Sequence, residues 1–351
     1  MSRRRIAVVG SGQEWSGLPL IRALGQERWR TFALFQDTDS ISTHTKFLHH
    51  KFRIPAEYNH NLIDYIMEVC KVHRITHLVC LDEEIKYLLV QNRNKLGKIK
   101  CALPSLQSYE IALKKNLSSS FARNVGVPIP ETTLIKDRKE LENLNFDFRK
   151  KAVIKGVRGW SSLHVRYASN RKELIRYYDD ICSNEENIKS ADSFPMIQEY
   201  FGGPTYLTQG FAQHGKVKVV VPHIKFREWP LSGGYTTRAK TIGDSRLIEY
   251  MTRIMEEMNW HGEAGMEWKY DPIKDDFVFL EMNPRFEGSL DIAIKAGVNF
   301  PKMLVNAMDD VPIPDGIEYR SNTHFRWFFR QDFHLFLEKP YGLHNLILES
   351  L

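Results

Sequence analysis

Short apolar runs alternate with helical patterns through the first part of the chain. An apolar run at 6–9 precedes a glycine-rich turn, and the residues after the turn repeat with helical spacing. A second strand is predicted at 31–37, an amphipathic helix at 61–75, and a third strand, ending in acids, at 76–84. Because such alternation is typical of a parallel sheet covered by helices, we expect a doubly wound sheet over residues 1–105.

The glycine-rich turn does not follow the usual dinucleotide pattern. Gly10, Gly12 and Gly17 give G-x-G-x-x-x-x-G instead of G-x-G-x-x-G, and no acidic residue is clearly placed for a ribose. Isolated glycine patterns are also nonspecific. The turn therefore disfavours nicotinamide and flavin cofactors.

The charge balance constrains the partners. The chain has 351 residues and a net charge of +6, from 49 basic and 43 acidic residues. The basic residues are dispersed except at 3–5, so no basic stripe supports nucleic-acid binding. We expect no nucleic-acid partner, and we expect an anionic small molecule to benefit from the positive charge.

The cysteines and the apolar segments predict the compartment. The four cysteines lack Cys-x-x-Cys spacing and a local histidine partner, which argues against zinc and against a disulfide framework. The apolar run near the N-terminus is too short for a signal-peptide core, and no later run approaches membrane-spanning length. We expect a soluble, cytoplasmic protein without a membrane partner.

A single amphipathic helix is expected after the first domain. Ser108 is suited to cap it, and Gly126 and Pro128 to end it. Its apolar stripe recurs every four residues, at Leu113, Leu117, Phe121 and Val125. Lys115 lies off this stripe, where a surface lysine would ordinarily be expected.

Two acidic residues end neighbouring strands of a predicted hairpin. Glu267 and Glu281 lie fourteen residues apart, so both carboxylates are expected on one face of a sheet. A divalent cation would remove their repulsion, and Asn283, on the same strand face as Glu281, offers a third oxygen ligand. Arg285 continues this alternation and suits a phosphate or an oxyanion. The alternative is a solvated edge strand with alternating polar residues.

The segment "FVFLEMNPRFEGSLDIAIKAGVNFP" resembles the metal-binding strand and following helix of the ATP-grasp superfamily, as in carbamoyl phosphate synthetase and D-alanine ligase. The resemblance implies that Glu267, Glu281 and Asn283 bind Mg²⁺, which Mn²⁺ could replace. It implies an α/β chain, α+β in its second part, with a Rossmann-like domain followed by a two-lobed ATP-grasp domain. We expect the small ATP-grasp subdomain at 106–190 and the C-terminal lobe at 191–351.

The resemblance also implies an ATP site. "ALKKNLSSSFARNVGVPIPET" and "AVIKGVRGWSSLHV" resemble the two lysine segments that meet the phosphates, and "IQEYFGG" resembles the hinge that meets adenine. In place of the usual ribose-binding glutamate the chain has a threonine. The implied nucleotide contacts are Lys115, Lys155, Gly159, Ser161, Ser162, Glu199, Tyr200, Phe201 and Thr205.

"HIKFREWPLSGGYTTRAKT" resembles a stretch found in carboxylate–amine ligase-like members of the superfamily. The implied substrate residues are Arg227, Gly233, Gly234, Thr236 and Arg238, and the implied catalytic residues are Arg285, Lys225 and Arg227. A pair of arginines is a common receptor for carboxylates, although ordinary salt bridging would explain these arginines equally well.

The resemblance implies an enzyme: an ATP-dependent ligase that converts a carboxylate into an acyl phosphate and couples it to an amine, releasing ADP and phosphate. Its partners would be a small carboxylate and a small amine, and a homodimer is the assembly expected from relatives. One alternative is an enzyme that activates bicarbonate, as carboxylases and carbamoyl phosphate synthetase do. A second alternative is a non-catalytic ATP-binding sensor or scaffold, which the threonine and the bulky Trp160 favour.

Overall fold

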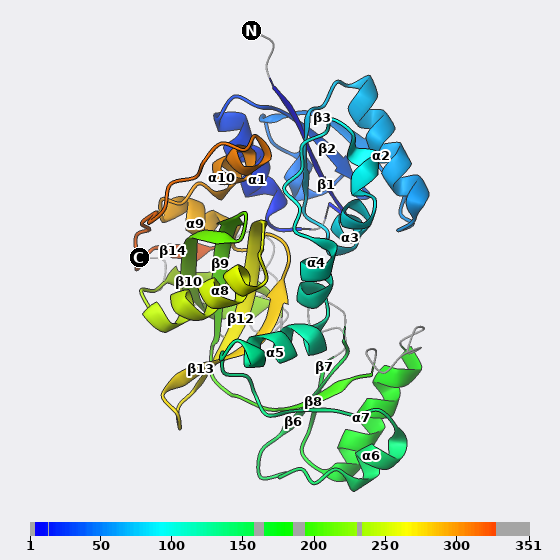
Figure 1. Cartoon of the computed structure of the whole chain (residues 1–351), viewed down its shortest axis with the longest axis vertical. Coiled ribbons are helices and arrows are strands. Elements are labelled where there is room, and N and C mark those ends of the chain that lie inside the picture. The colour runs from blue at the N-terminus through cyan, green and yellow to red at the C-terminus, as the bar shows by residue number, and fades with distance from the viewer. Residues whose placement is uncertain (1–3, 13, 158–164, 185–193, 230–233, 328–351) are drawn as a thin grey trace, which may run out of the picture.

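The computed structural model describes residues 4–12, 14–157, 165–184, 194–229 and 234–327. The described chain forms three sheets. Figure 1 shows the N-terminal sheet at one end of the long axis, a small sheet at the other end, and a six-stranded sheet between them. This mixed α/β architecture confirms the fold class predicted from the sequence.

The first sheet is parallel, with the strand order β3-β2-β1-β4. Its apolar strands β1 and β2 are buried, as their sequence predicted, whereas β3 is polar and was not foreseen. Asn59 caps α2 and Asp82 caps α3 through side-chain acceptors. The elements of this part are β1 (Arg5–Gly10), α1 (Gly17–Gln26), β2 (Arg30–Phe35), η1 (Ile41–Thr43), β3 (Leu48–Arg53), α2 (His60–Val72), β4 (His77–Cys80), α3 (Glu83–Gln91) and η2 (Arg93–Leu96).

The helix predicted from Ser108 is two helices, α4 (Leu106–Leu113) and α5 (Lys115–Asn124). Ser105, not Ser108, caps α4 by accepting from the Ser108 amide. The chain breaks at Lys114, whose extended backbone (φ −99°, ψ 115°) cannot continue a helix. The prediction of one helix was therefore wrong, and the break turns the start of α5 in a new direction.

The small sheet is antiparallel, with the strand order β5-β8-β6-β7. Two helices pack on it and bury a separate apolar cluster that includes Ile154, Leu174 and Ile197. The elements are β5 (Thr132–Leu134), α6 (Arg138–Asn143), β6 (Ala152–Lys155), β7 (Val165–Ala168), α7 (Arg171–Asn184) and β8 (Met196–Glu199). The predicted strand pair around Lys155 is thus present as β6 and β7.

The central sheet is antiparallel throughout, with the strand order β13-β12-β9-β10-β11-β14. Helix α8 buries Leu247, Met251, Ile254 and Met255 against it, as the apolar stripe predicted. Gly210 allows the close approach, because a Cβ there would lie 2.6 Å from Met251 Cε. The elements are β9 (Thr205–Gln213), β10 (Lys216–Trp229), β11 (Tyr235–Thr241), α8 (Ser245–Glu257), β12 (Gly262–Asp271), β13 (Asp276–Asn283), α9 (Leu290–Lys295), α10 (Phe300–Met308) and β14 (His324–Arg326).

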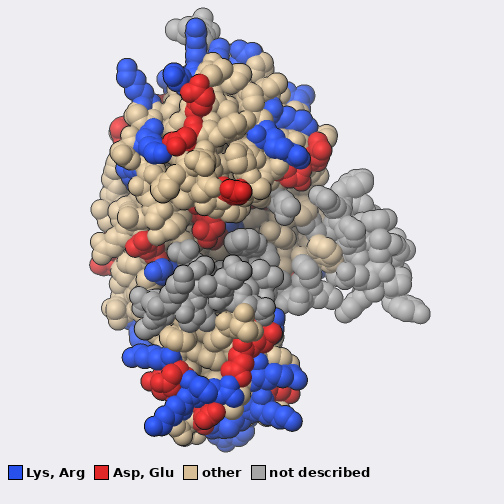
Figure 2. All heavy atoms as spheres, turned by 90° about the vertical axis from the view of Figure 1, so that its right-hand side faces the viewer, with Lys and Arg blue, Asp and Glu red and all other residues tan. Residues whose placement is uncertain are grey.

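Charges of both signs share the face drawn in Figure 2. On the part that carries α6 and α7, Lys and Arg side chains lie among Asp and Glu side chains. Arg138 pairs with Glu142 at 3.0 Å on this part. Within the residues that the structure describes, no helix combines the length and the apolar character that crossing a membrane requires.

Candidate functional site

The hairpin of β12 and β13 brings the predicted acidic pair together. Glu267 lies opposite Glu281, and Gly265 lies opposite Asn283. The register shifts directly after Glu267, so the strand is irregular where the acid emerges. The predicted juxtaposition of the two carboxylates is therefore present in the structure.

Lys115 enters this site from the break between α4 and α5. Its amide donates to the carbonyl of Val157 at 2.9 Å, and its Nζ lies 2.9 Å from Glu281 Oε2. Burial opposes the charge on both side chains. The pairing outweighs burial, because the pKa of Lys115 is raised and the pKa of Glu281 is lowered.

Lys155 ends strand β6 and is 8% exposed. Burial lowers its pKa to about 8, although the Glu281 carboxylate acts in the opposite direction. The Glu281 carboxylate, which pairs with Lys115, therefore also favours the charged form of Lys155. The phosphate-loop residues predicted with it, Gly159, Ser161 and Ser162, lie outside the described residues.

Lys225 is buried on β10 beside the other acid of the hairpin. Its Nζ lies 2.6 Å from Glu228 Oε2 and donates to the Gly234 carbonyl at 3.3 Å. Burial would depress the pKa of Lys225, but the carboxylates of Glu267 and Glu228 raise it. Burial raises the pKa of Glu267, which Lys225 partly offsets. Each carboxylate of the hairpin thus has a buried ammonium group near it.

Arg285 does not continue the strand alternation, which ends with β13 at Asn283. Its backbone turns, with its amide donating to the Asn283 carbonyl at 2.8 Å. Its side chain reaches across to the N-terminal part of the chain, where Nε lies 2.8 Å from Oε1 of Glu83, the first residue of α3. The expected alternation was wrong at this residue, and the guanidinium faces helix α3 instead.

Glu287 was not among the predicted site residues. It is 7% exposed, and its Oε1 accepts from Asn283 Nδ2 at 2.9 Å. Burial raises its pKa to about 7, although Arg285 acts against this. The position two residues after Arg285 in "NPRFEGS" was the available sequence signal.

The donor set suits Mg²⁺. The Asn283 amide nitrogen is used by Glu287, which leaves the amide oxygen as the acceptor beside two carboxylates. In this structure the Lys115 ammonium group provides positive charge next to the Glu281 carboxylate, as a bound metal ion would. Within the described residues, no cluster of three or more His, Cys, Asp or Glu side chains suits a metal ion. A metal site here would therefore need the Asn283 amide oxygen in addition to the Glu267 and Glu281 carboxylates.

A cavity of about 520 Å³ lies between the small sheet and the central sheet, next to the predicted hinge. Glu199, Tyr200 and Phe201 line it, and the Glu199 carboxylate pairs with Lys150. Thr205 is not among the described residues that line it, although Pro204 and Tyr206 are. The structure therefore gathers three of the predicted adenine and ribose contacts and leaves Thr205 aside. The other lining residues are Lys150, Gly202, Gly203, Tyr270, Asp271, Pro272, Ile273 and Lys274.

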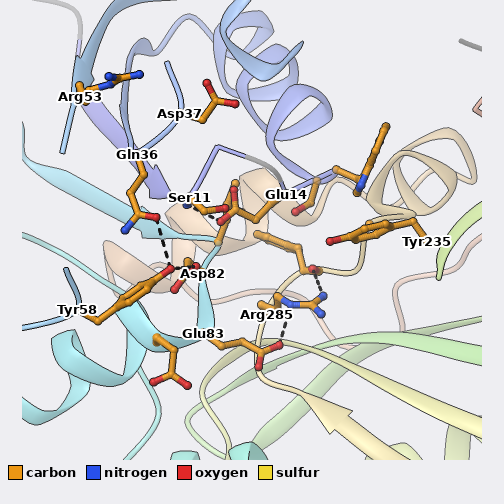
Figure 3. Close-up of a pocket in the computed structure, with 16 residues that line it drawn as sticks. Ser11, Glu14, Gln36, Asp37, Arg53, Tyr58, Asp82, Glu83, Tyr235 and Arg285 are labelled. Carbon is orange, nitrogen blue, oxygen red and sulfur yellow. Dashed lines mark hydrogen bonds and ion pairs between the residues drawn. The ribbon is translucent and has the colours of Figure 1, made fainter. Parts of the chain in front are cut away.

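A second cavity, of about 500 Å³, lies where the strands of the parallel sheet end (Figure 3). Arg285 borders it from the central part of the chain, together with Tyr235. Among the described residues, neither Arg227, Thr236 nor Arg238 lines it, and the Arg238 guanidinium lies 5.7 Å from the centroid of the exposed Phe226 ring. Gly233 lies outside the described residues.

Residues 193–328 match the family model "ATP-grasp in the biosynthetic pathway with Ter operon". This range contains the whole central sheet and the hairpin with Glu267 and Glu281. No curated protein sequence matches the chain.

Solved structures that share the fold include three of different origin. Biotin carboxylase from Campylobacter jejuni is 15% identical, with a TM-score of 0.72 over 92% of this chain and 74% of that one. The biotin carboxylase domain dimer of Hydrogenobacter thermophilus 2-oxoglutarate carboxylase, with MgADP, ADP and bicarbonate, is 16% identical, with a TM-score of 0.71 over 92% and 73%. An L-amino acid ligase from Bacillus licheniformis is 14% identical, with a TM-score of 0.71 over 92% and 79%. The comparisons confirm the resemblance: the chain has the ATP-grasp fold.

Proposed function

We propose that the chain is an ATP-dependent ligase that activates a carboxylate as an acyl phosphate and couples it to an amine. The observation that carries the proposal is the convergence of Lys115 on Glu281, opposite Glu267, from a helix start far away in the sequence. An ordinary edge strand would not gather buried ammonium groups around its acids. A site that must hold triphosphate and a cation needs both charges in one place.

In this proposal ATP lies between the small and central sheets. The cavity beside Glu199, Tyr200 and Phe201 would take adenine. Lys115 and Lys155 would hold the phosphates, and Glu267, Glu281 and Asn283 would hold Mg²⁺. The bound ion would neutralise charge on the phosphate oxygens as the transfer proceeds.

The reaction needs no nucleophile from the protein. An oxygen of the substrate carboxylate attacks the γ-phosphorus, the bond to the bridging oxygen breaks, and ADP leaves with the electron pair. The amine nitrogen then attacks the acyl carbon, the bond from carbon to phosphate oxygen breaks, and the nitrogen loses a proton. Arg285 would stabilise the acyl phosphate and its tetrahedral successor, and catalysis would rest on positioning and charge.

The test is the nature of the products. Purified protein with Mg-ATP and pooled amines and carboxylates should release ADP and phosphate, and an amide should form in proportion. Glu281→Gln should abolish this turnover, whereas Glu249→Gln, an exposed acid on α8, should not change it. AMP and pyrophosphate as products, or full turnover in Glu281→Gln, would refute the proposal.

A second candidate keeps the site and replaces the substrate by bicarbonate. The likeness to two biotin carboxylase structures, one of them with bicarbonate, favours it. Bicarbonate-dependent ADP release without any amine or organic carboxylate would support it over the ligase.

We also propose a division of the chain into 1–105, 106–190 and 191–351, with a homodimer as the assembly and the cytoplasm as the compartment. Limited proteolysis, light scattering and cell fractionation would test these three points.

A further inference from the structure

The cavity beside Arg285 has a strongly acidic wall. Five carboxylates and two guanidinium groups line it, and one guanidinium, Arg285, is already paired with Glu83. Figure 3 shows Glu14 and Asp82 by the parallel sheet, and Arg285 next to the Glu83 carboxylate. Ligands of such sheets bind outside the carboxyl ends of the strands, which is where this cavity lies. The acidic lining residues are Glu14, Asp37, Asp82, Glu83 and Glu84.

Glu14 occupies the place where a nucleotide phosphate would bind in a related fold. Its carboxylate accepts from the amides of Ser11 at 2.7 Å and Gly12 at 2.9 Å. These are the amides of the turn after β1, which elsewhere cradle anions. A Cβ at Gly10 would lie 2.6 Å from Glu14 Oε1, so the glycine makes room for this carboxylate. The Glu14 carboxylate therefore occupies the amides of this turn, and its negative charge disfavours binding of an anion there.

Asp82 adds a second carboxylate on the same side. It accepts from the Ile85 amide at 2.9 Å and from the Tyr58 hydroxyl at 3.2 Å. Burial raises the pKa of Asp82, and burial followed by repulsion from Asp82 contributes to the raised pKa of Glu14. Both carboxylates would gain from a positive group between them.

A buried hydroxyl also lines the cavity. Ser16 is 1% exposed, and its side chain does not cap helix α1, which begins beside it. The hydroxyl offers a donor and an acceptor to a polar ligand group in the cavity.

We propose that this cavity binds the amine substrate in its ammonium form, with Glu14 and Asp82 as its receptors. The inference rests on the proposed ligase function and adds the class and the place of the amine. The ammonium group of the substrate would lie at the acidic side of the cavity, and Arg285 would contact the acyl phosphate. The walls of Trp15, Tyr235 and Phe286 would cover the carbon skeleton.

In the proposed step the amine nitrogen loses two protons and displaces phosphate from the acyl carbon. The ammonium gives one proton to a carboxylate of the acidic wall, and the freed nitrogen pair attacks the acyl carbon at Arg285. The bond from carbon to phosphate oxygen breaks and phosphate leaves. A second proton leaves the nitrogen for solvent as the amide forms.

The experiment compares three ligands of one chain length by calorimetry on the full chain without ATP: 1,4-diaminobutane, butanedioate and 1,4-butanediol. We expect the diamine to bind and the other two to bind at least about tenfold more weakly, because a charge-assisted hydrogen bond is lost. Asp82→Asn should weaken diamine binding about tenfold, since asparagine keeps the helix cap but removes the charge. Asp64→Asn, which changes an exposed acid on α2, should leave it unchanged.

Three results would overturn the inference: no binding of the diamine, equal binding of the diacid or diol, or unaltered diamine binding in Asp82→Asn. Measuring ADP release separately distinguishes this failure from failure of the ligase proposal. Selective diamine binding without any amine-dependent ADP release would contradict the ligase and keep the cation site. ADP release with amide formation but without selective diamine binding would support the ligase and contradict the cation site.

Discussion

Lys115 Nζ lies 2.9 Å from Glu281 Oε2, and this contact joins the start of α5 to the end of β13. The small sheet and strands β9 to β12 of the central sheet lie between the two residues in the sequence, so the contact links distant parts of the chain. The pair is the centre of the proposed phosphate and metal site. Its strength is therefore the first quantity to measure.

A double-mutant cycle of Lys115→Met and Glu281→Gln should show coupling. Each single change leaves a largely buried charge without its main partner, so each should destabilise the fold more than the pair of changes does together. We expect an interaction energy of about 0.5–3 kcal/mol from denaturant unfolding. Additive single effects would show that the two side chains act independently.

Glu83 should position Arg285 for catalysis. Glu83→Gln removes the charge that holds the guanidinium at 2.8 Å, and we expect kcat to fall about tenfold with little change in the KM for ATP. Arg285→Lys should lower kcat by about 10²-fold, because an ammonium group cannot reproduce the planar guanidinium. Steady-state kinetics with saturating second substrate would measure both, and a Glu83→Gln effect on KM alone would contradict the positioning role.

Glu199 should act in nucleotide binding. Its carboxylate lines the cavity beside Tyr200 and Phe201 and pairs with Lys150. Glu199→Gln should raise the KM for ATP several-fold and leave kcat nearly unchanged, since a contact equally strong in the ground and transition states changes binding only. Discrimination between ATP and GTP should fall in parallel. Glu249→Gln, at an exposed acid on α8 outside this cavity, is the matched control.

The hairpin and its acids could be predicted because they follow local rules. Period-two alternation in β12 and β13 indicates which residues share a face of the sheet. The number of residues between Glu267 and Glu281 predicts that the two lie opposite each other in the hairpin. The parallel sheet was equally predictable, since buried strands β1 and β2 are continuously apolar.

The remaining contacts depend on long-range packing. The helix break at Lys114 has no glycine or proline to mark it, so the orientation of Lys115 was not accessible from local pattern. Glu83 was predicted at the end of the third strand but begins helix α3, and its pairing with Arg285 joins segments about two hundred residues apart. The prediction that Arg285 shares a strand face with Asn283 was wrong for the same reason. Strand β13 ends at Asn283, and the Arg285 side chain is directed by its long-range pairing with Glu83.

Acid should destabilise the fold through His223. Burial lowers its pKa to about 4, and its Nε2 lies 2.9 Å from the Ser289 hydroxyl. An unfolded histidine has a pKa near 6.5, so between about pH 6.5 and 4 the unfolded state binds more protons and stability falls as pH falls. Below about pH 4 both states are protonated and this loss is complete.

Urea unfolding at several pH values would measure that slope. His223→Gln should reduce it, while His261, whose pKa burial also lowers to about 4, should maintain part of it. An unchanged slope in His223→Gln would show that the buried imidazole does not govern acid stability.

The buried pair of Lys86 and Glu263 should link stability to the site loop. Lys86 Nζ lies 2.6 Å from Glu263 Oε1 and donates to the Pro284 carbonyl at 2.8 Å, and both side chains are almost fully buried. Glu263 Oε2 has no hydrogen-bond partner in the described part of the chain, so Lys86 is the main compensation for its charge. Lys86→Met should therefore cost about 3–5 kcal/mol of unfolding free energy, and Lys86→Met with Glu263→Gln should recover part of it. Because Pro284 stands between Asn283 and Arg285, turnover should stay impaired in the double variant even where stability returns, and full recovery of both would show that this bond does not position the loop.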